Sequence, residues 1–317
     1  MQPNRLYTLT ALVVTLVVTT AGACSAAPQE APVSNPTKTS APTAAPAVRS
    51  GRAEINGVRY YYEFHGQGSP ILMLHGGLGS IGLFEPGLPA FAEHHQVIAV
   101  DLQGHGRTPL GDRKTIDPSD IANDLAVLVG QLGHDKVDVI GYSFGGAIAI
   151  RLAVQHPAVV RKLVLISVVF AQDGFYPEML PQQAQVSAAI APMLKETPLY
   201  TTYVAVAPNP DEFPTLLDRM GEWMRRPYDW SADVKKLTMP VMLVYGDSDM
   251  IRLEHVVEFY KLLGGGQKDA GWQREHMSPN RLAILPDVTH YEMDRAPALP
   301  RAVLPFLDGS GGAPAGK

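Results

Sequence analysis

Residues 136–150 have the sequence KVDVIGYSFGGAIAI, in which a serine separates a β-branched run from an alanine-rich run. This pattern predicts a strand over 136–140, a sharp corner at Ser143 and a helix over 144–155. Such a corner strains the backbone, so the residues two before and two after it must be small, as Gly141 and Gly145 are. The free backbone N–H groups at a helix N-terminus stabilise negative charge. Ser143 is therefore predicted to be a nucleophile.

A nucleophilic serine needs a base and an acidic group that orients the base. The apolar run 240–246 predicts a buried strand, and Asp247 and Asp249 follow at its end. Carboxylates at the C-terminal ends of parallel strands point into the active-site crevice. Either aspartate can be the acid, and the other can serve as the N-cap of a helix that begins near Leu253.

His290 lies in the loop that follows the last predicted strand, 281–286. This position is the one expected for the base in the chain order serine, aspartate, histidine. His255 also follows the candidate acids, but it falls inside a predicted helix. Most of the other histidines lie in turns, helix ends or polar loops, where a solvated or capping role is ordinary. We therefore predict that His290 is the base.

An oxyanion hole is the remaining requirement. The run 70–74 predicts an early buried strand, which leads into the glycine-rich segment 75–80, HGGLGS. Glycines let the backbone approach a tetrahedral oxygen and leave N–H groups free to donate. We predict that the backbone N–H groups of Gly77 and Phe144 are the two donors, and that His75 organises the loop through hydrogen bonds.

These motifs resemble those of the α/β-hydrolase superfamily. The matching segments, in chain order, are His75-Gly76-Gly77, Asp101 to Thr108, Gly141 to Gly146, Gly246 to Asp249 and Thr289-His290. The resemblance implies an eight-stranded, mostly parallel sheet with helices on both faces, and a catalytic triad of Ser143, Asp249 and His290. Together with the crevice geometry, it favours Asp249 over Asp247. Thr108 stands where many relatives carry serine, and we interpret its segment as a structural turn.

Strand and helix patterns alternate along the predicted domain, 51–307. The predicted strands cover 59–64, 71–74, 96–101, 136–140, 163–170, 241–245 and 282–285, and predicted helices cover 118–132, 144–155 and 253–263. This order predicts parallel strands joined by crossover helices. The exception is 171–236, a long, mostly helical insertion rich in methionine and aromatic residues. In the family that the chain resembles, an insertion at this place is a cap over the nucleophile.

The N-terminal residues are the second informative region. Arg5 precedes the apolar run 6–18, which is too short to span a bilayer and predicts an export signal over 1–23. The following AGACS sequence, 21–25, resembles the lipobox of bacterial lipoproteins, although leucine is commoner at its first position. Cys24 is the only cysteine in the chain, so no internal disulfide can form. We predict lipid modification of Cys24 and export to the outer side of the cell membrane; the alternative is cleavage and secretion.

Residues 24–50 are nearly all alanine, proline, serine and threonine. Such a composition cannot bury a core and predicts an extended tether between the anchor and the domain. The alternative is that the segment is simply the frayed end of an exported protein. The glycine-rich residues 308–317 predict a disordered tail.

Composition narrows the classes of function. The 317 residues are 46% hydrophobic and 18% charged with a net charge of −5, as expected for one sizeable globular domain. The absence of a basic patch argues against nucleic-acid binding. The chain has a single cysteine and no His-Glu-x-x-His motif, so no residues occur at the spacing typical of metal ligands. We therefore predict neither a metal nor a cofactor.

The sequence therefore predicts a membrane-tethered serine hydrolase that resembles carboxylic ester hydrolases and acts on a small apolar or aromatic acyl compound. Relatives that open epoxides or displace halide carry an aspartate at the nucleophile corner, and Ser143 excludes that chemistry. Cofactor-free perhydrolases and carbon–carbon bond hydrolases share the serine triad and remain alternatives. A surface binding protein that keeps the fold without catalysis is the alternative from a different class.

Overall fold

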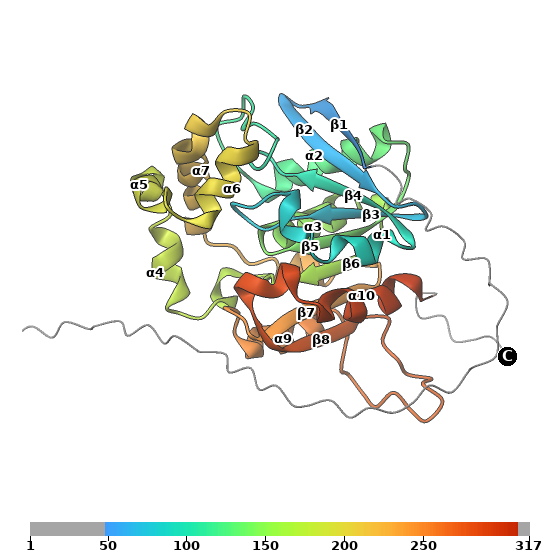
Figure 1. Cartoon of the computed structure of the whole chain (residues 1–317). Helices are drawn as coiled ribbons and strands as arrows, with labels where there is room; N and C mark the ends of the chain where they lie inside the picture. The colour runs from blue at the N-terminus through green and yellow to red at the C-terminus, as the bar shows by residue number, and fades with distance from the viewer. Residues whose placement is uncertain (1–47, 310–317) are drawn as a thin grey trace, which may run out of the picture. The chain divides into compact units, whose positions relative to one another are not determined.

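The computed structural model describes residues 48–309 (Figure 1). The strands are β1 (Arg49–Ile55), β2 (Val58–His65), β3 (Ser69–Leu74), β4 (His95–Asp101), β5 (Val137–Tyr142), β6 (Val160–Ile166), β7 (Val241–Ser248) and β8 (Arg281–Thr289). They form one sheet in the order β1-β2-β4-β3-β5-β6-β7-β8. The pairs β1/β2 and β2/β4 are antiparallel, and all the other pairs are parallel.

Helices cover both faces of the sheet and also form the insertion between β6 and β7 (Figure 1). The α-helices are α1 (Leu88–Ala92), α2 (Pro118–Gln131), α3 (Phe144–Gln155), α4 (Met179–Ala184), α5 (Ala191–Leu194), α6 (Pro198–Val206), α7 (Phe213–Arg225), α8 (Ser231–Val234), α9 (Leu253–Leu262) and α10 (Ala298–Asp308). The 3-10 helices are η1 (Ile81–Phe84), η2 (Pro157–Val159), η3 (Gln172–Gly174), η4 (Ala188–Ile190), η5 (Pro210–Glu212) and η6 (His290–Arg295).

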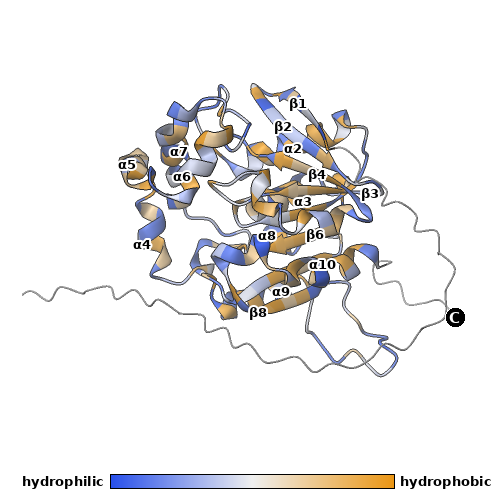
Figure 2. Cartoon of the chain, viewed as in Figure 1, coloured by the Kyte–Doolittle hydropathy of each residue, from blue (hydrophilic) through white to orange (hydrophobic). Residues whose placement is uncertain are grey.

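Side chains on the two faces of the central strands enter two separate hydrophobic clusters. On β3, Leu72 and Leu74 pack into the cluster that contains α2, α3 and α9, whereas Ile71 and Met73 pack into the cluster that contains α1 and α10. Because both faces are covered, these strands are apolar along their length and lack the alternation of a half-exposed sheet. Figure 2 shows this as hydrophobic strands in the middle of the sheet. The predicted fold, an eight-stranded and mostly parallel sheet flanked by helices, is confirmed.

One predicted strand has different bounds in the structure, and one observed strand was not predicted. The run 163–170 is β6 only as far as Ile166, and the strand begins earlier, at Val160. Val168, Val169 and Phe170 continue the apolar run because they are buried in the loop beyond the strand. β1 was not predicted, because its largely exposed sequence lacks the apolar run of a buried strand.

The predicted segments at both ends of the chain lie mainly outside the described residues. The export signal at 1–23, Cys24 and most of the tether at 24–50 fall there, as do residues 310–317 of the tail. Residues 49 and 50, which we expected in the tether, belong to β1 and pair with β2. Asp308, expected to begin the tail, is the last residue of α10.

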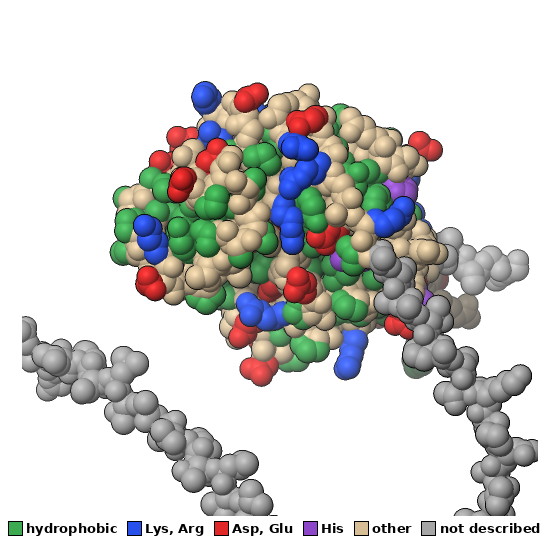
Figure 3. All heavy atoms as spheres, turned by 45° about the horizontal axis from the view of Figure 1, so that its top comes forward, with side chains coloured by type: hydrophobic (Ala, Val, Ile, Leu, Met, Phe, Trp, Pro, Cys, Tyr) green, Lys and Arg blue, Asp and Glu red, His purple; other side chains and the backbone are tan. Residues whose placement is uncertain are grey.

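The insertion at 171–236 contains α4 to α8, in agreement with the helical pattern of the sequence. Its longest helix, α7, buries one face through Phe213, Leu216, Leu217 and Met220. We call residues 171–236 the cap. Hydrophobic side chains are visible at the surface on this side of the molecule, at the left of Figure 3. Among residues 48–309, no helix has the length and apolar character needed to cross a bilayer.

Candidate active site

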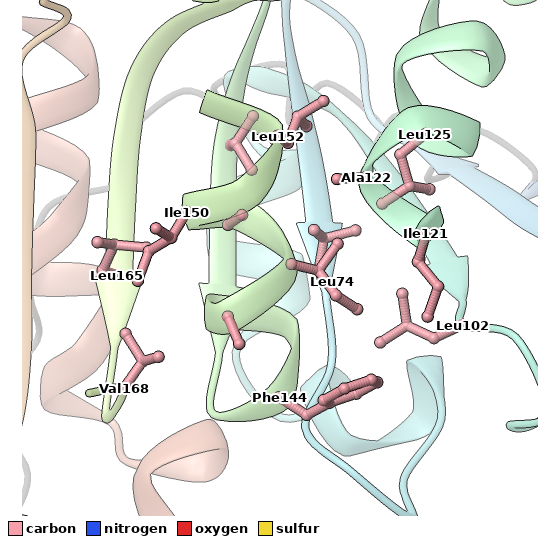
Figure 4. Packing of buried hydrophobic residues seen from close by; sticks show 14 of the residues in the cluster. Leu74, Leu102, Ile121, Ala122, Leu125, Phe144, Ile150, Leu152, Leu165 and Val168 are labelled. Atoms are coloured by element: carbon pink, nitrogen blue, oxygen red, sulfur yellow. The ribbon is translucent and has the colours of Figure 1, made fainter. Parts of the chain in front are cut away.

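Ser143 occupies the predicted corner between β5 and α3. Its backbone has φ 52° and ψ −115°, in a region that non-glycine residues rarely adopt. A Cβ atom on Gly145 would lie 2.3 Å from the carbonyl oxygen of Leu74, so only glycine permits this approach of helix to strand. Figure 4 shows Phe144 at the start of α3, with Leu74 and Leu102 beside it. The sequence pattern and the local geometry therefore agree at this corner.

The three residues predicted as a triad lie in one chain of hydrogen bonds. The Ser143 hydroxyl oxygen is 3.1 Å from Nε2 of His290, and Nδ1 of His290 is 2.9 Å from Oδ1 of Asp249. A carboxylate can only accept, so Nδ1 carries the proton and Nε2 is free to accept from Ser143. His290 is 6% exposed and Asp249 is 9% exposed, so water competes little for these contacts.

Asp247 does not take part in this chain. Its side chain is exposed and accepts a hydrogen bond from the backbone N–H of Asp287 at 3.0 Å. Neither aspartate is the N-cap of α9, because that position belongs to Arg252. Of these two carboxylates, which lie two residues apart in the sequence, only that of Asp249 contacts His290.

Two hydrogen bonds that sequence reasoning missed support the triad. The Ser167 hydroxyl donates to Oδ2 of Asp249 at 2.5 Å, so both carboxylate oxygens are occupied. The Tyr142 hydroxyl donates to the backbone carbonyl of His290 at 2.5 Å. Burial raises the pKa of Tyr142, so its hydroxyl keeps its proton and remains a donor. No motif marked Ser167, because it lay inside the run that we predicted as a strand.

The predicted oxyanion donors face the same cavity as Ser143. Gly77 and Phe144 both line that cavity. A Cβ atom on Gly77 would lie 3.6 Å from Cβ of Phe144 and 3.0 Å from Cε of Met220, so the two segments run close together. This arrangement can place two backbone N–H groups near a carbonyl oxygen attached to Ser143.

His75 holds the loop that carries Gly77. Its Nδ1 donates to the carbonyl of Gly76 at 2.7 Å, and its Nε2 accepts from the backbone N–H of Leu102 at 3.0 Å. Burial lowers the pKa of His75 to about 4, so the ring is neutral and can accept that second bond at neutral pH. This is the loop-organising role that the sequence suggested.

The segment from Asp101 to Thr108 is a turn whose hydrogen bonds connect β2, β4 and η1. The Asp101 carboxylate accepts from the backbone N–H groups of Ile81 and Arg107, at 2.7 and 2.8 Å. Thr108 donates its hydroxyl to the carbonyl of Asp101 and accepts from the backbone N–H of Tyr61. Threonine therefore performs a structural role at this position.

A cavity of about 860 Å³ lies between the cap and the rest of the domain, which we call the body. Ser143 and His290 are in the wall of this cavity. Its size is within the range of sites that enclose a small organic molecule. The rings of Phe144 and Trp223 meet edge to face with centroids 4.9 Å apart, so the cap packs directly beside the corner at Ser143. Within residues 48–309 no cluster of three histidine, cysteine or acidic side chains is placed to hold a metal ion.

Residues 69–192 match the family model described as the alpha/beta hydrolase fold. The protein has the α/β-hydrolase fold. Solved structures with this architecture include carboxylesterase CesB (YbfK) from Bacillus subtilis, with a TM-score of 0.64 at 18% identity, covering 84% of this chain and 93% of that one. E-2-(acetamidomethylene)succinate hydrolase has a TM-score of 0.62 at 19% identity, covering 83% and 100%.

Curated relatives of this chain are hydrolases of different kinds. A putative carbamate hydrolase, RutD, from Azorhizobium caulinodans is 34% identical over 42% of this chain and 49% of its own length. A soluble epoxide hydrolase from Corynebacterium sp. is 37% identical over 37% and 41%. In both cases the match spans less than half of the relative. A pimeloyl-[acyl-carrier protein] methyl ester esterase from Legionella pneumophila is 29% identical over 59% and 78%.

Proposed function

We propose that the protein is a serine hydrolase that cleaves an ester or a related acyl compound through an acyl-enzyme on Ser143. The observation that carries this proposal is the continuous hydrogen-bond chain from Ser143 through His290 to Asp249. The hydrolase relatives support the broader assignment to hydrolysis. The methyl ester esterase among them supports an ester as the substrate.

In the proposed mechanism, His290 accepts the Ser143 proton while Oγ forms a bond to the carbonyl carbon. The backbone N–H groups of Gly77 and Phe144 donate to the resulting oxyanion. His290 then gives its proton to the leaving group as the bond between carbonyl carbon and leaving group breaks. Water, deprotonated by His290, hydrolyses the acyl-enzyme and releases the acid. Asp249 stabilises the imidazolium in both halves of the reaction.

The epoxide hydrolase relative does not change this proposal. Epoxide opening through an alkyl-ester intermediate needs a carboxylate as the nucleophile, and the corner of this chain carries the hydroxyl of Ser143. A hydroxyl activated by a neighbouring imidazole is suited to attack on a carbonyl carbon. The nucleophile therefore favours acyl transfer.

Covalent labelling tests the proposal. A fluorophosphonate probe should label the wild-type protein, and Ser143→Ala should abolish labelling while the unfolding transition stays unchanged, because this hydroxyl faces a cavity. Ser187→Ala is the matched control on the cap, outside the cavity wall, and should label fully. Full labelling of Ser143→Ala would refute the nucleophile. A wild-type protein that never labels would favour a non-catalytic binding protein.

A further inference from the structure

The wall of the cavity is divided by charge. The cap, residues 171–236, contributes apolar side chains such as Leu199, Val206 and Trp223, together with uncharged polar ones, and none of its lining residues is charged. The acidic and basic lining residues all come from the body of the domain: Glu85, Arg107, Asp294 and Arg295. A molecule that fills this cavity therefore meets an uncharged end under the cap and a polar end that carries all four charged residues.

Three of these four charged residues, Arg107, Asp294 and Arg295, have partners of opposite sign. Nη1 of Arg107 is 3.2 Å from the Asp101 carboxylate and 3.8 Å from that of Glu63. Nε of Arg295 is 3.9 Å from the Asp294 carboxylate. The charged lining residues are two acids and two bases, so their formal charges cancel, and this part of the wall presents hydrogen-bonding groups.

The chemistry of acyl transfer sets the direction of a bound ester. His290 must protonate the departing alkoxide, so the alcohol part of the substrate lies on the His290 side. Tyr291, Asp294 and Arg295 belong to the same short helix as His290, η6, and all line the cavity. The acyl part then lies on the other side of Ser143, where Phe144 meets Trp223 of the cap.

We propose that the substrate is an ester of an apolar carboxylic acid with an uncharged, hydroxyl-bearing alcohol. The acyl chain binds beneath the cap, and the alcohol binds against η6. This inference rests on the proposed function and adds the substrate class and its orientation. The bonds that form and break are those of acyl transfer to Ser143, with water as the second reactant.

Two isomeric esters test the orientation. 1-Monohexanoylglycerol has an apolar acyl group and a polar alcohol, whereas hexyl glycerate has the same atoms with the two polarities exchanged. After correction for the rates of alkaline hydrolysis, we expect kcat/KM to be at least ~10-fold higher for monohexanoylglycerol, a ratio that misplaced apolar groups commonly produce. Hexanoylcholine should be a poorer substrate than monohexanoylglycerol, because the polar end has little excess negative charge.

Variants locate the acyl end. Leu199→Trp on α6 narrows the cavity beneath the cap, and it should lower kcat/KM for the hexanoyl ester at least ~10-fold while leaving the acetyl ester of glycerol nearly unchanged. Met193→Trp is the matched control, since Met193 is 72% exposed on the cap and outside the cavity wall. It should leave both rates unchanged.

A variant of Asp294 tests the alcohol end. Asp294→Leu removes hydrogen-bonding capacity from η6, so it should lower kcat/KM for monohexanoylglycerol more than for ethyl hexanoate, by roughly 10-fold. Turnover of ethyl hexanoate by the same variant shows that it is folded. Asp294→Asn keeps hydrogen-bonding groups and should retain most of the selectivity.

The outcomes separate this proposal from the proposed function. Equal corrected rates for the two isomers, or faster hydrolysis of hexyl glycerate, would overturn the orientation while Ser143 remains the nucleophile. A probe-reactive enzyme that hydrolyses neither isomer would overturn the substrate class. Failure of the probe to label Ser143 would overturn the serine hydrolase itself.

Discussion

Two serines of the site are in the left-handed region of φ, Ser143 at 52° and Ser167 at 49°. Residues other than glycine rarely adopt this region because it strains the backbone. A strained conformation persists where surrounding contacts hold the residue in place. Ser167 is held by its backbone N–H, which donates to the carbonyl of Val244 at 2.9 Å, and by its bond to Asp249. In the proposed mechanism Ser143 is the nucleophile, and Ser167 orients the acid, Asp249.

We predict that Ser167→Ala lowers kcat about 10-fold with little change in KM. A hydrogen bond to a charged group contributes about 1.5–3 kcal/mol, and the loss of roughly 1.4 kcal/mol of transition-state stabilisation is a tenfold loss of rate. A double-mutant cycle measures the coupling: in an Asp249→Asn background the effect of Ser167→Ala should nearly vanish. Equal effects in both backgrounds would show that Ser167 acts only on the general stability of the fold.

At the scale of elements, the close approach of α3 to the strands beneath it decides the shape of the site. Gly145 lies against the carbonyl oxygens of Leu74 and His75, and a Cβ on Gly141 would lie 2.4 Å from the carbonyl oxygen of Gly145. These contacts bring the N-terminus of α3 next to the glycine-rich loop after β3. The same approach places Phe144 and Gly77 in one wall of the cavity.

We predict that Gly145→Ala destabilises the protein by about 1–3 kcal/mol, because the added methyl group overlaps backbone atoms that cannot move aside. It should also displace Phe144, so kcat/KM should fall by more than the loss of folded protein explains. Gly130→Ala is the matched control in α2, where a Cβ would meet nothing within 4 Å. That control should stabilise the protein by about 0.5–1 kcal/mol. Urea unfolding of both variants measures the difference, and equal free energies of unfolding would contradict the argument.

At the scale of the whole molecule, three buried histidines connect stability to pH. Burial lowers the pKa of His75 and His255 to about 4 and that of His105 to about 3. His255 accepts from the backbone N–H of Phe170 at 3.2 Å, and the other two lie together beside the oxyanion loop. These rings are neutral in the folded protein over a range in which the unfolded chain protonates them.

We predict that the free energy of unfolding falls as the pH is lowered from 6.5 toward 4. The unfolded histidines bind protons below about pH 6.5 and the folded ones do not, so each contributes a slope of up to about 1.4 kcal/mol per pH unit. The contribution of these neutral histidines to the free energy of unfolding is complete above about pH 6.5 and is lost as the pH is lowered. Urea unfolding at pH 7, 6 and 5 measures this slope.

Variants assign the slope to the buried rings. His255→Leu should make the slope shallower by about one proton, even though it destabilises the protein at pH 7 by removing the acceptor of Phe170. His94→Gln is the control, because the side chain of His94 is exposed, and it should leave the slope unchanged. A free energy of unfolding that stays constant from pH 7 to 5 would contradict the prediction.

The N-terminal residues carry a prediction about location. We propose that Cys24 is lipidated and that the enzyme is held on the outer side of the cell membrane. Cys24→Ser, made in a bacterium with lipoprotein-processing enzymes, should move from the membrane fraction to the soluble or unprocessed fraction. Two acyl chains, at about 0.8 kcal/mol per buried methylene, anchor a protein stably where one does not. Unchanged membrane association of a correctly cleaved Cys24→Ser protein would refute lipidation.

The sequence by itself determined the corner at Ser143, the order of buried strands and helices, and the position of the cap. Each of these is a local pattern: small residues where the backbone bends sharply, apolar runs where both faces are covered, and helical periodicity in the insertion. These patterns predict parallel strands joined by crossover helices, and the resemblance of the motifs to those of α/β-hydrolases implied the rest of the fold. β1 was missed because an exposed edge strand needs no apolar run.

Only the tertiary structure decided which side chains meet. Asp249 and Asp247 have similar sequence surroundings, and the contact with His290, 41 residues away, depends on how the ends of β7 and β8 lie side by side. The bond from Ser167 to Asp249 crosses between β6 and β7 in the same way. The polarity of the cavity also arises from segments far apart in the chain, because the cap covers one part of its wall and η6 forms another. Local sequence specifies the backbone of each element, whereas packing of distant elements sets the distances on which chemistry depends.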